Sequence, residues 1–175
     1  MKKILLFALV LSASFYGFSQ DAKFGVRAGI NVSNLDFDGT PAADNTHRNG
    51  FVIGFFAEYS FSNSVSISPE LQFSSEGAKP EPLQLDYIQM PVLFNFKLSP
   101  KILFNVGPQV GLKVSKVDDG IRNFAYSGVG GLSYNVTPMI FIDARYIYGV
   151  SNIFDKELGI KAKNSAMQFG VGYKF

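Results

Sequence analysis

The feature that most constrains the fold is a period-two alternation of apolar and polar residues, which recurs along the chain. Near the C-terminus, for example, Asp143 and Arg145 lie on the face opposite to Ile142. Successive side chains of a β-strand point to opposite faces, so this pattern predicts strands with two different faces. The predicted strands span residues 23–33, 50–61, 64–75, 86–98, 101–116, 123–136, 139–150 and 165–175. The sixth segment is rich in glycine, and its pattern leaves open which face is which.

The connections between these segments alternate strictly between short and long. Three are two-residue turns, namely Ser62-Asn63, Ser99-Pro100 and Thr137-Pro138, and the others are long loops at 34–49, 76–85, 117–122 and 151–164. Such alternation is typical of barrels in an outer membrane, where one rim carries tight turns and the other carries longer loops. The sequence therefore predicts an all-β fold, an eight-stranded antiparallel up-and-down transmembrane β-barrel of the outer-membrane type.

The two faces of the predicted strands differ in chemistry. One face is almost entirely Phe, Ile, Val, Leu and Tyr, and aromatic residues near the strand ends predict two girdles at the membrane interfaces. The other face is small and polar, and it carries the charged residues Arg27, Glu58, Glu70, Lys113, Asp143, Arg145 and Lys174. A membrane barrel exposes its apolar face to lipid and turns its polar face inward. The alternative is a soluble exported barrel with the faces reversed, which would bind an apolar ligand.

The seven charged residues of the polar face are expected to form a charge network in the lumen. Asp143 and Arg145 are two residues apart, so they point to the same side of one strand. Such a network could gate a narrow path for ions or small solutes. Side chains fill the interior of an eight-stranded barrel, and buried charges must be paired, so a structural core is the favoured interpretation.

The first 19 residues have the features of a secretory signal peptide. Lys2 and Lys3 precede an apolar run at 4–11, and small and polar residues follow up to Ser19. Cleavage after Ser19 would leave residues 20–175 as one barrel domain. Because both lysines would depart, 14 basic residues would face 14 acidic ones. A formally neutral chain is not expected to bind nucleic acid by electrostatic attraction.

Composition argues against catalysis and against bound cofactors or metals. The chain has no Cys, which excludes thiolate ligands and Cys nucleophiles, and its single His is His47. Asp36 and Asp38 resemble the start of a calcium loop, but the later ligands are missing. The glycine-rich stretch 128–131 has no following helix, as a phosphate-binding loop would require. We expect no catalytic residue, no metal site and no cofactor.

Four stretches, at 24–31, 68–73, 87–91 and 143–149, resemble the PorT-like outer-membrane β-barrel family in their order and spacing. The resemblance covers essentially the whole chain after the predicted signal. It implies the barrel fold, residence in outer-membrane lipid and handling by the outer-membrane assembly machinery. Tyr173 and Phe175 resemble the aromatic C-terminal signal that this machinery recognises.

The naming member of this family is associated with protein secretion. The resemblance therefore favours a structural or partner-binding role in the cell envelope, with a secretion or envelope protein as partner. The alternatives are a narrow pore for ions or small solutes and the soluble barrel described above.

Overall fold

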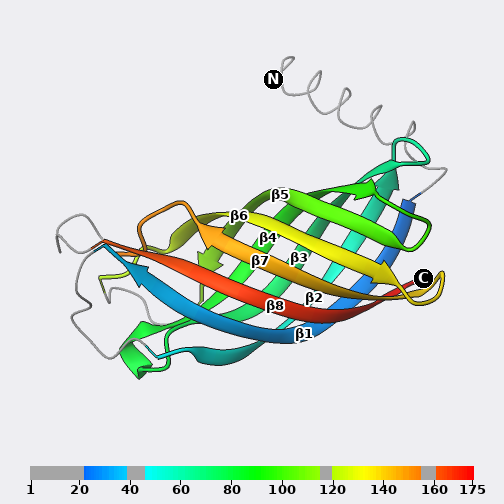
Figure 1. The fold of residues 1–175 in the computed structure, drawn as a ribbon. Helices are drawn as coiled ribbons and strands as arrows, with labels where there is room; N and C mark the ends of the chain where they lie inside the picture. The colour runs from blue at the N-terminus through cyan, green and yellow to red at the C-terminus, as the bar shows by residue number, and fades with distance from the viewer. Residues whose placement is uncertain (1–21, 39–45, 115–119, 155–160) are drawn as a thin grey trace, which may run out of the picture.

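The computed structural model describes residues 22–38, 46–114, 120–154 and 161–175, which form a closed barrel (Figure 1). Its strands are β1 (Ala22–Phe37), β2 (Arg48–Ser60), β3 (Val65–Gly77), β4 (Gln84–Lys97), β5 (Ile102–Lys113), β6 (Phe124–Asn135), β7 (Ile140–Gly149) and β8 (Ala162–Lys174). Each strand pairs antiparallel with its neighbours in sequence, and β1 pairs with β8. The predicted eight-stranded up-and-down barrel is confirmed. The predicted signal peptide, residues 1–19, lies outside the described residues.

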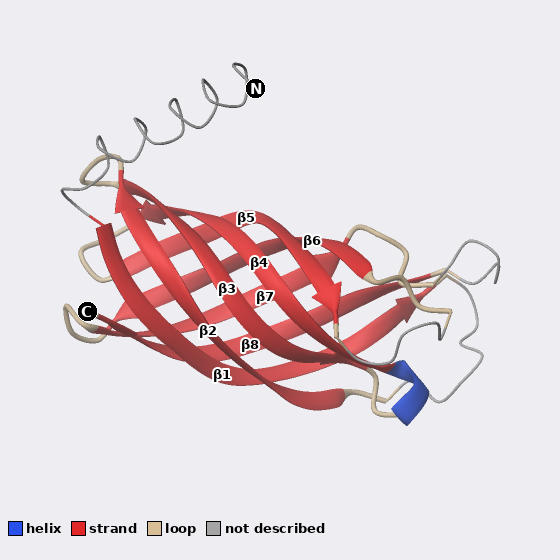
Figure 2. Cartoon of the chain, turned by 180° about the vertical axis from the view of Figure 1, so that it is seen from behind, coloured by secondary structure: helices blue, strands red, loops and turns tan. Residues whose placement is uncertain are grey.

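Closure of the sheet gives every strand two hydrogen-bonded neighbours. The register between β1 and β8 runs from the Gly25–Lys174 pair to the Phe37–Ala162 pair. Viewed from behind, the strands run obliquely around the barrel axis without an open edge (Figure 2). A closed sheet leaves no row of unpaired N–H and C=O groups along an edge strand. Among the described residues, no helix is long and apolar enough to cross a membrane.

Several strands extend beyond their predicted ends. β1 continues to Phe37, β3 continues to Gly77 and β8 begins at Ala162, where the sequence predicted loops. The extra residues pair with each other, as Asn34 does with Ser165. Loops were predicted there because the alternation of apolar and polar residues ends. The backbone pairing between neighbouring strands nevertheless continues past that point.

The short connections share one local structure. They are four residues long (61–64, 98–101 and 136–139) rather than the predicted two. In the first, the Ser62 hydroxyl oxygen accepts hydrogen bonds from the amides of Ser64 and Val65, at 3.2 and 3.1 Å. Ser99 and Thr137 do the same in the other two turns. We call this end of the barrel the short-turn rim and the opposite end the long-loop rim.

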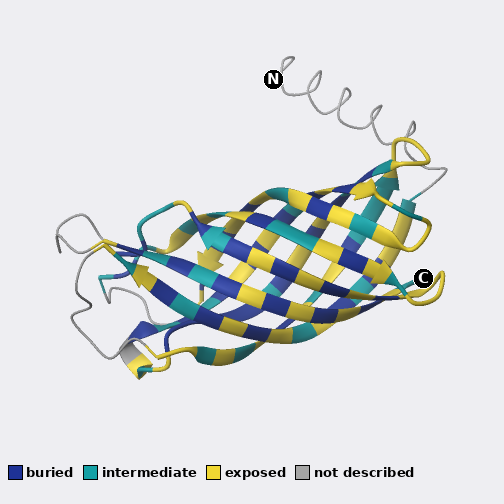
Figure 3. Cartoon of the chain, in the orientation of Figure 1, coloured by how far each residue is buried: buried dark blue, intermediate teal, exposed yellow. Residues whose placement is uncertain are grey.

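The outer surface is apolar over all eight strands. Along most of the sheet, buried residues alternate with exposed or half-buried ones (Figure 3). Large exposed side chains include Phe24, Ile30, Phe55, Leu71, Met90, Val106, Leu132, Ile142, Phe169 and Val171. The facing of β6, which the sequence left open, is settled by the burial of Val129 and Ser133, while Phe124 and Tyr126 are exposed.

Glycines on the inward face make room for large interior side chains. A Cβ atom added to Gly25 would overlap the ring of Phe56, and one added to Gly172 would overlap the ring of Phe141. A Cβ at Gly170 would lie 2.9 Å from the Arg27 guanidinium. The narrow interior therefore holds rings and guanidinium groups only because the neighbouring strand carries no side chain at these points.

We predict that Gly172→Ala destabilises the barrel by about 1–3 kcal/mol, the usual cost of overpacking a filled interior. The matched control is Gly130→Ala, because a Cβ at Gly130 would meet no atom within 4 Å. This control is expected to be neutral or slightly stabilising, since Gly weakens a strand interior. Urea unfolding in detergent micelles measures both, and equal midpoints for the two variants would contradict the interpretation.

Candidate functional site: the barrel lumen

Two bidentate ion pairs lie at the centre of the lumen. The Arg27 guanidinium donates to both carboxylate oxygens of Asp143, at 2.7 and 2.6 Å. The Arg145 guanidinium donates to both oxygens of Glu70, at 2.7 and 3.0 Å. Arg145 Nη2 also lies 3.6 Å from Asp143 Oδ2, which joins the two pairs. All four residues are buried.

One of these pairs crosses the lumen, and the other links two strands on the same side of it. Glu70 is on β3 and Arg145 is on β7, which are four strands apart in a closed barrel of eight and so lie on opposite walls. Arg27 on β1 reaches Asp143 across the intervening β8. The central network, defined as Arg27, Glu70, Asp143 and Arg145, therefore spans the barrel from side to side.

The central network continues toward the long-loop rim through neutral side chains. Arg27 Nη1 donates to Gln168 Oε1 at 3.1 Å, and Gln168 Nε2 donates to Ser74 Oγ at 3.4 Å. Ser74 in turn donates to Glu76 at 2.7 Å. This chain of hydrogen bonds links β1, β8 and β3.

Glu76 is a buried carboxylate that the sequence analysis missed. Gln89 and Asn164 also donate hydrogen bonds to it, so three side chains stabilise it. The sequence placed Glu76 and Asn164 in loops, whereas they lie in β3 and β8. The inward parity of Gln72 and Ser74 extends to Glu76, and that signal could have identified it.

The other predicted charges occupy separate places. Lys174 donates to Glu58 at 2.7 Å, toward the short-turn rim. Lys113 lies near the long-loop rim, where its amino group donates to the backbone carbonyl of Ile121 at 3.1 Å. Of the seven predicted residues, four form the central network. Glu58 and Lys174 form a separate ion pair, and Lys113 binds a backbone carbonyl.

An aromatic pair lies near the Glu58–Lys174 pair. The rings of Phe56 and Phe141 are both buried, and they meet edge to face with centroids 5.6 Å apart. Lys174 Nζ lies 5.4 Å from the Phe141 ring centroid. Rings from β2 and β7 thus occupy lumen space that glycines on β1 and β8 leave free.

An apolar cluster fills the inner side of the strand ends near the long-loop rim. We call it the apolar cap, and it consists of Leu35, Ala78, Leu83, Leu85, Tyr87, Ile121, Ile153, Phe154 and Ala162. Its members come from strand ends and from the connecting segments that follow them. The sequence did not predict the cap, because these residues come from four separate parts of the chain.

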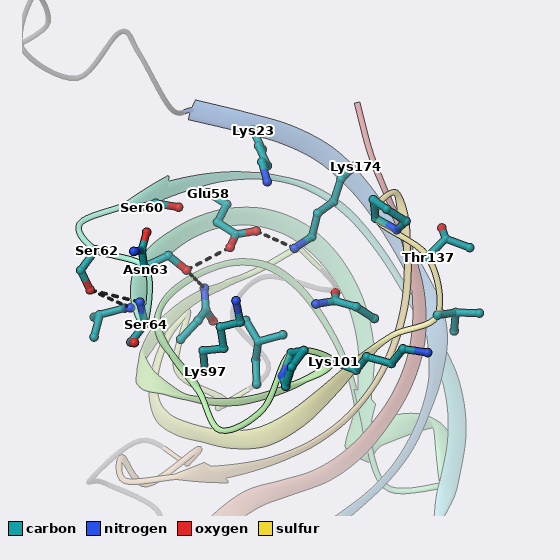
Figure 4. Close-up of a pocket in the computed structure, with 18 residues that line it drawn as sticks. Lys23, Glu58, Ser60, Ser62, Asn63, Ser64, Lys97, Lys101, Thr137 and Lys174 are labelled. Atoms are coloured by element: carbon teal, nitrogen blue, oxygen red, sulfur yellow. Dashed lines mark hydrogen bonds and ion pairs between the residues drawn. The ribbon is translucent and has the colours of Figure 1, made fainter.

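The short-turn rim is open instead. A cavity of about 500 Å³ opens there, which we call the cup (Figure 4). It adjoins a much smaller pocket of about 30 Å³, whose lining includes Phe56, Phe141, Glu70 and Arg145. This pocket is far smaller than the cup, so the open space narrows where it meets the central network.

In the described part of the chain, the acidic and His side chains do not gather into a metal-binding group. No group of three or more His, Cys, Asp or Glu side chains there could hold a metal ion. His47 is exposed and forms an isolated bridge with Ala78. Asp36 accepts a hydrogen bond from Tyr148 at 3.4 Å, at the long-loop rim.

Residues 4–175 match a family model described as "outer membrane protein beta-barrel domain". The chain belongs to this outer-membrane β-barrel family. No curated protein matches the sequence.

Three solved structures show the same fold as this outer-membrane barrel. Neisserial surface protein A is 19% identical, with a TM-score of 0.61, and the match covers 89% of this chain and 100% of that one. Ail, the attachment invasion locus protein of Yersinia pestis, is 18% identical, with a TM-score of 0.58 and the same coverage. A de novo designed transmembrane β-barrel is 12% identical, with a TM-score of 0.51, and the match covers 87% and 95% of the two chains.

Family membership decides which solvent the apolar face meets. In an outer-membrane barrel this face lies against lipid, and the polar face lines the lumen. The described structure has this arrangement, with exposed Phe, Ile and Val outside and the central network inside. The soluble barrel, which needs an apolar interior for its ligand, does not fit a lumen that holds two ion pairs.

We predict that Arg145→Ala destabilises the outer-membrane barrel by about 3–5 kcal/mol, because it leaves Glu70 as an unpaired buried carboxylate. The double variant Glu70→Leu/Arg145→Leu removes both charges and should recover part of that loss. Lys161→Ala, at an exposed position outside the lumen, is the control and should leave unfolding unchanged. An unchanged urea midpoint for Arg145→Ala in detergent would show that the network does not stabilise the fold.

Proposed function

We propose that this protein is a PorT-like barrel that works without catalysis, as a structural or partner-binding component of the cell envelope. In this role the barrel is a closed scaffold, and contacts with other molecules are made at its two rims. The partner would be an envelope or secretion protein, as the resemblance to PorT-like proteins implies.

The observation that carries this proposal is the position of the central network across the lumen. Arg145 and Glu70 come from opposite walls, and Nη1 and Nη2 of the guanidinium donate to the two carboxylate oxygens. Opening a path here would break a bidentate buried pair and leave charges without partners, which is costly. The apolar cap adds a second barrier near the long-loop rim.

A narrow pore is the competing function. The cup and the adjoining pocket give it limited support, because they carry solvent-accessible space from the short-turn rim to Arg145. A pore would require that space to continue past the central network and the apolar cap.

The proposal includes an orientation. Short turns of outer-membrane barrels face the periplasm, and longer loops face the outside. The short-turn rim contains the start of β1 and the end of β8, and it would then open to the periplasm. Residues 1–19 would act as a cleaved export signal that brings the chain to this compartment.

We predict that the wild-type barrel gives no single-channel steps in a planar lipid bilayer. Replacing Arg27, Glu70, Asp143 and Arg145 together by Ser should still give no steps in a variant that keeps the gel mobility of a folded barrel, because the apolar cap remains in place. Clear steps from the wild-type protein would overturn the closed-scaffold proposal in favour of a pore.

Assembly is expected to depend on the aromatic end of the chain. The rings of Tyr173 and Phe175 are 5.7 Å apart, and Phe175 is 72% exposed. Phe169 is also exposed and lies on the same strand face, but it is not terminal.

We predict that Phe175→Ala lowers the amount of folded barrel recovered from outer membranes several-fold, whereas Phe169→Ala has little effect. Heat-modifiable gel mobility of membrane fractions measures the folded share. Equal recovery of the two variants would show that Phe175 is not part of the assembly signal.

A further inference from the structure

The cup at the short-turn rim is strongly basic. Four lysines line it (Lys23, Lys97, Lys101 and Lys174) against a single carboxylate, Glu58, which gives the lining a formal charge of +3. The central network, with two arginines and two carboxylates, is balanced. The lining of the cup therefore carries an excess of positive charge that the central network lacks.

Two of these lysines already have partners. Lys174 pairs with Glu58 at 2.7 Å, and Lys101 lies over the ring of Tyr134, 5.8 Å from its centroid. Lys101 points away along the rim, whereas Lys23 and Lys97 point into the cup (Figure 4). Within the described residues, neither Lys23 nor Lys97 forms an ion pair.

Neutral groups in the cup are suited to a peptide. Asn63 and Asn135 line it, and in the part of the chain that the structure describes their side chains have no hydrogen-bond partner. A carboxamide both donates and accepts, as a peptide backbone does, whereas a fully ionised phosphate only accepts. The volume of about 500 Å³ suits a short segment rather than a folded domain.

We propose that the cup binds an acidic, extended peptide segment of a partner protein. Lys23 and Lys97 contact its carboxylates, and Asn63 and Asn135 contact its backbone. This inference rests on the proposed partner-binding role and names the chemistry of the partner. The binding is salt-dependent, because these lysines are exposed and their field is screened by ions.

The test uses the barrel purified in detergent micelles, where both rims are open to solvent, and fluorescently labelled hexaglutamate as the probe. Fluorescence anisotropy at low salt should show binding of hexaglutamate and none of hexalysine. Each exposed ion pair is worth about two- to five-fold in affinity. The variant Lys23→Gln/Lys97→Gln should therefore bind hexaglutamate about four- to 25-fold more weakly.

The matched control is Lys161→Gln/Lys163→Gln, which removes two lysines that line a pocket at the opposite rim and should leave binding unchanged. The reversed variant Lys23→Glu/Lys97→Glu should bind hexalysine in preference to hexaglutamate. Heat-modifiable gel mobility checks that every variant is folded.

Two results would overturn the proposal. One is hexaglutamate binding that the cup variant leaves unchanged, or that the control variant weakens equally. The other is binding of inorganic polyphosphate without binding of hexaglutamate, which would assign the cup to a phosphate ligand. Either failure leaves the conductance test untouched, so the closed-scaffold role and the peptide site are judged separately.

Discussion

The hydrogen bonds between β1 and β8 are the interaction on which the rest of this structure depends. They close the sheet, so that strand edges are paired around the whole circle. In the hydrocarbon core of a membrane, where no water is available to backbone groups, an open edge would be prohibitively costly. Closure with eight strands also leaves an interior so narrow that side chains fill it. The inward side chains must then pack against one another. Each charged side chain among them needs a partner on another strand.

The lumen meets this requirement differently along its length. In the middle, one bidentate ion pair joins opposite walls, and a second links β1 to β7 across β8. Toward the long-loop rim, Glu76 is held by neutral donors, and the apolar cap packs beyond it. Toward the short-turn rim, the aromatic pair of Phe56 and Phe141 gives way to the basic cup. The barrel is thus filled and balanced at its centre and carries its distinctive chemistry at its ends, which is the arrangement expected of a scaffold that binds partners at its rims.

The extent to which the sequence predicted this lumen can be judged from single residues. Period-two parity placed Arg27, Glu70, Asp143 and Arg145 on the inward face. It suggested that Asp143 and Arg145 belong together, yet each makes its bidentate pair with another strand, and they approach each other only to 3.6 Å. Glu76 and Asn164 were assigned to loops, because the strands continue past the point where large apolar residues mark the outer face. Backbone pairing needs no such pattern, so sequence periodicity underestimates β1, β3 and β8 at that end, whereas it places the ends of β5 and β7 slightly too far.

The sequence by itself determined the number of strands, their order, the rim at which each connection lies and, in every strand but β6, which face each side chain occupies. These properties follow from the local geometry of an extended chain, in which neighbouring side chains alternate. Only the tertiary structure decided which inward residues meet, that four loop and strand segments form one apolar cap, and that Lys23 and Lys97 point into the same cavity. Each of these contacts depends on the register of several strands at once and on the closure of the barrel. The sequence of a single strand specifies neither the register nor the closure.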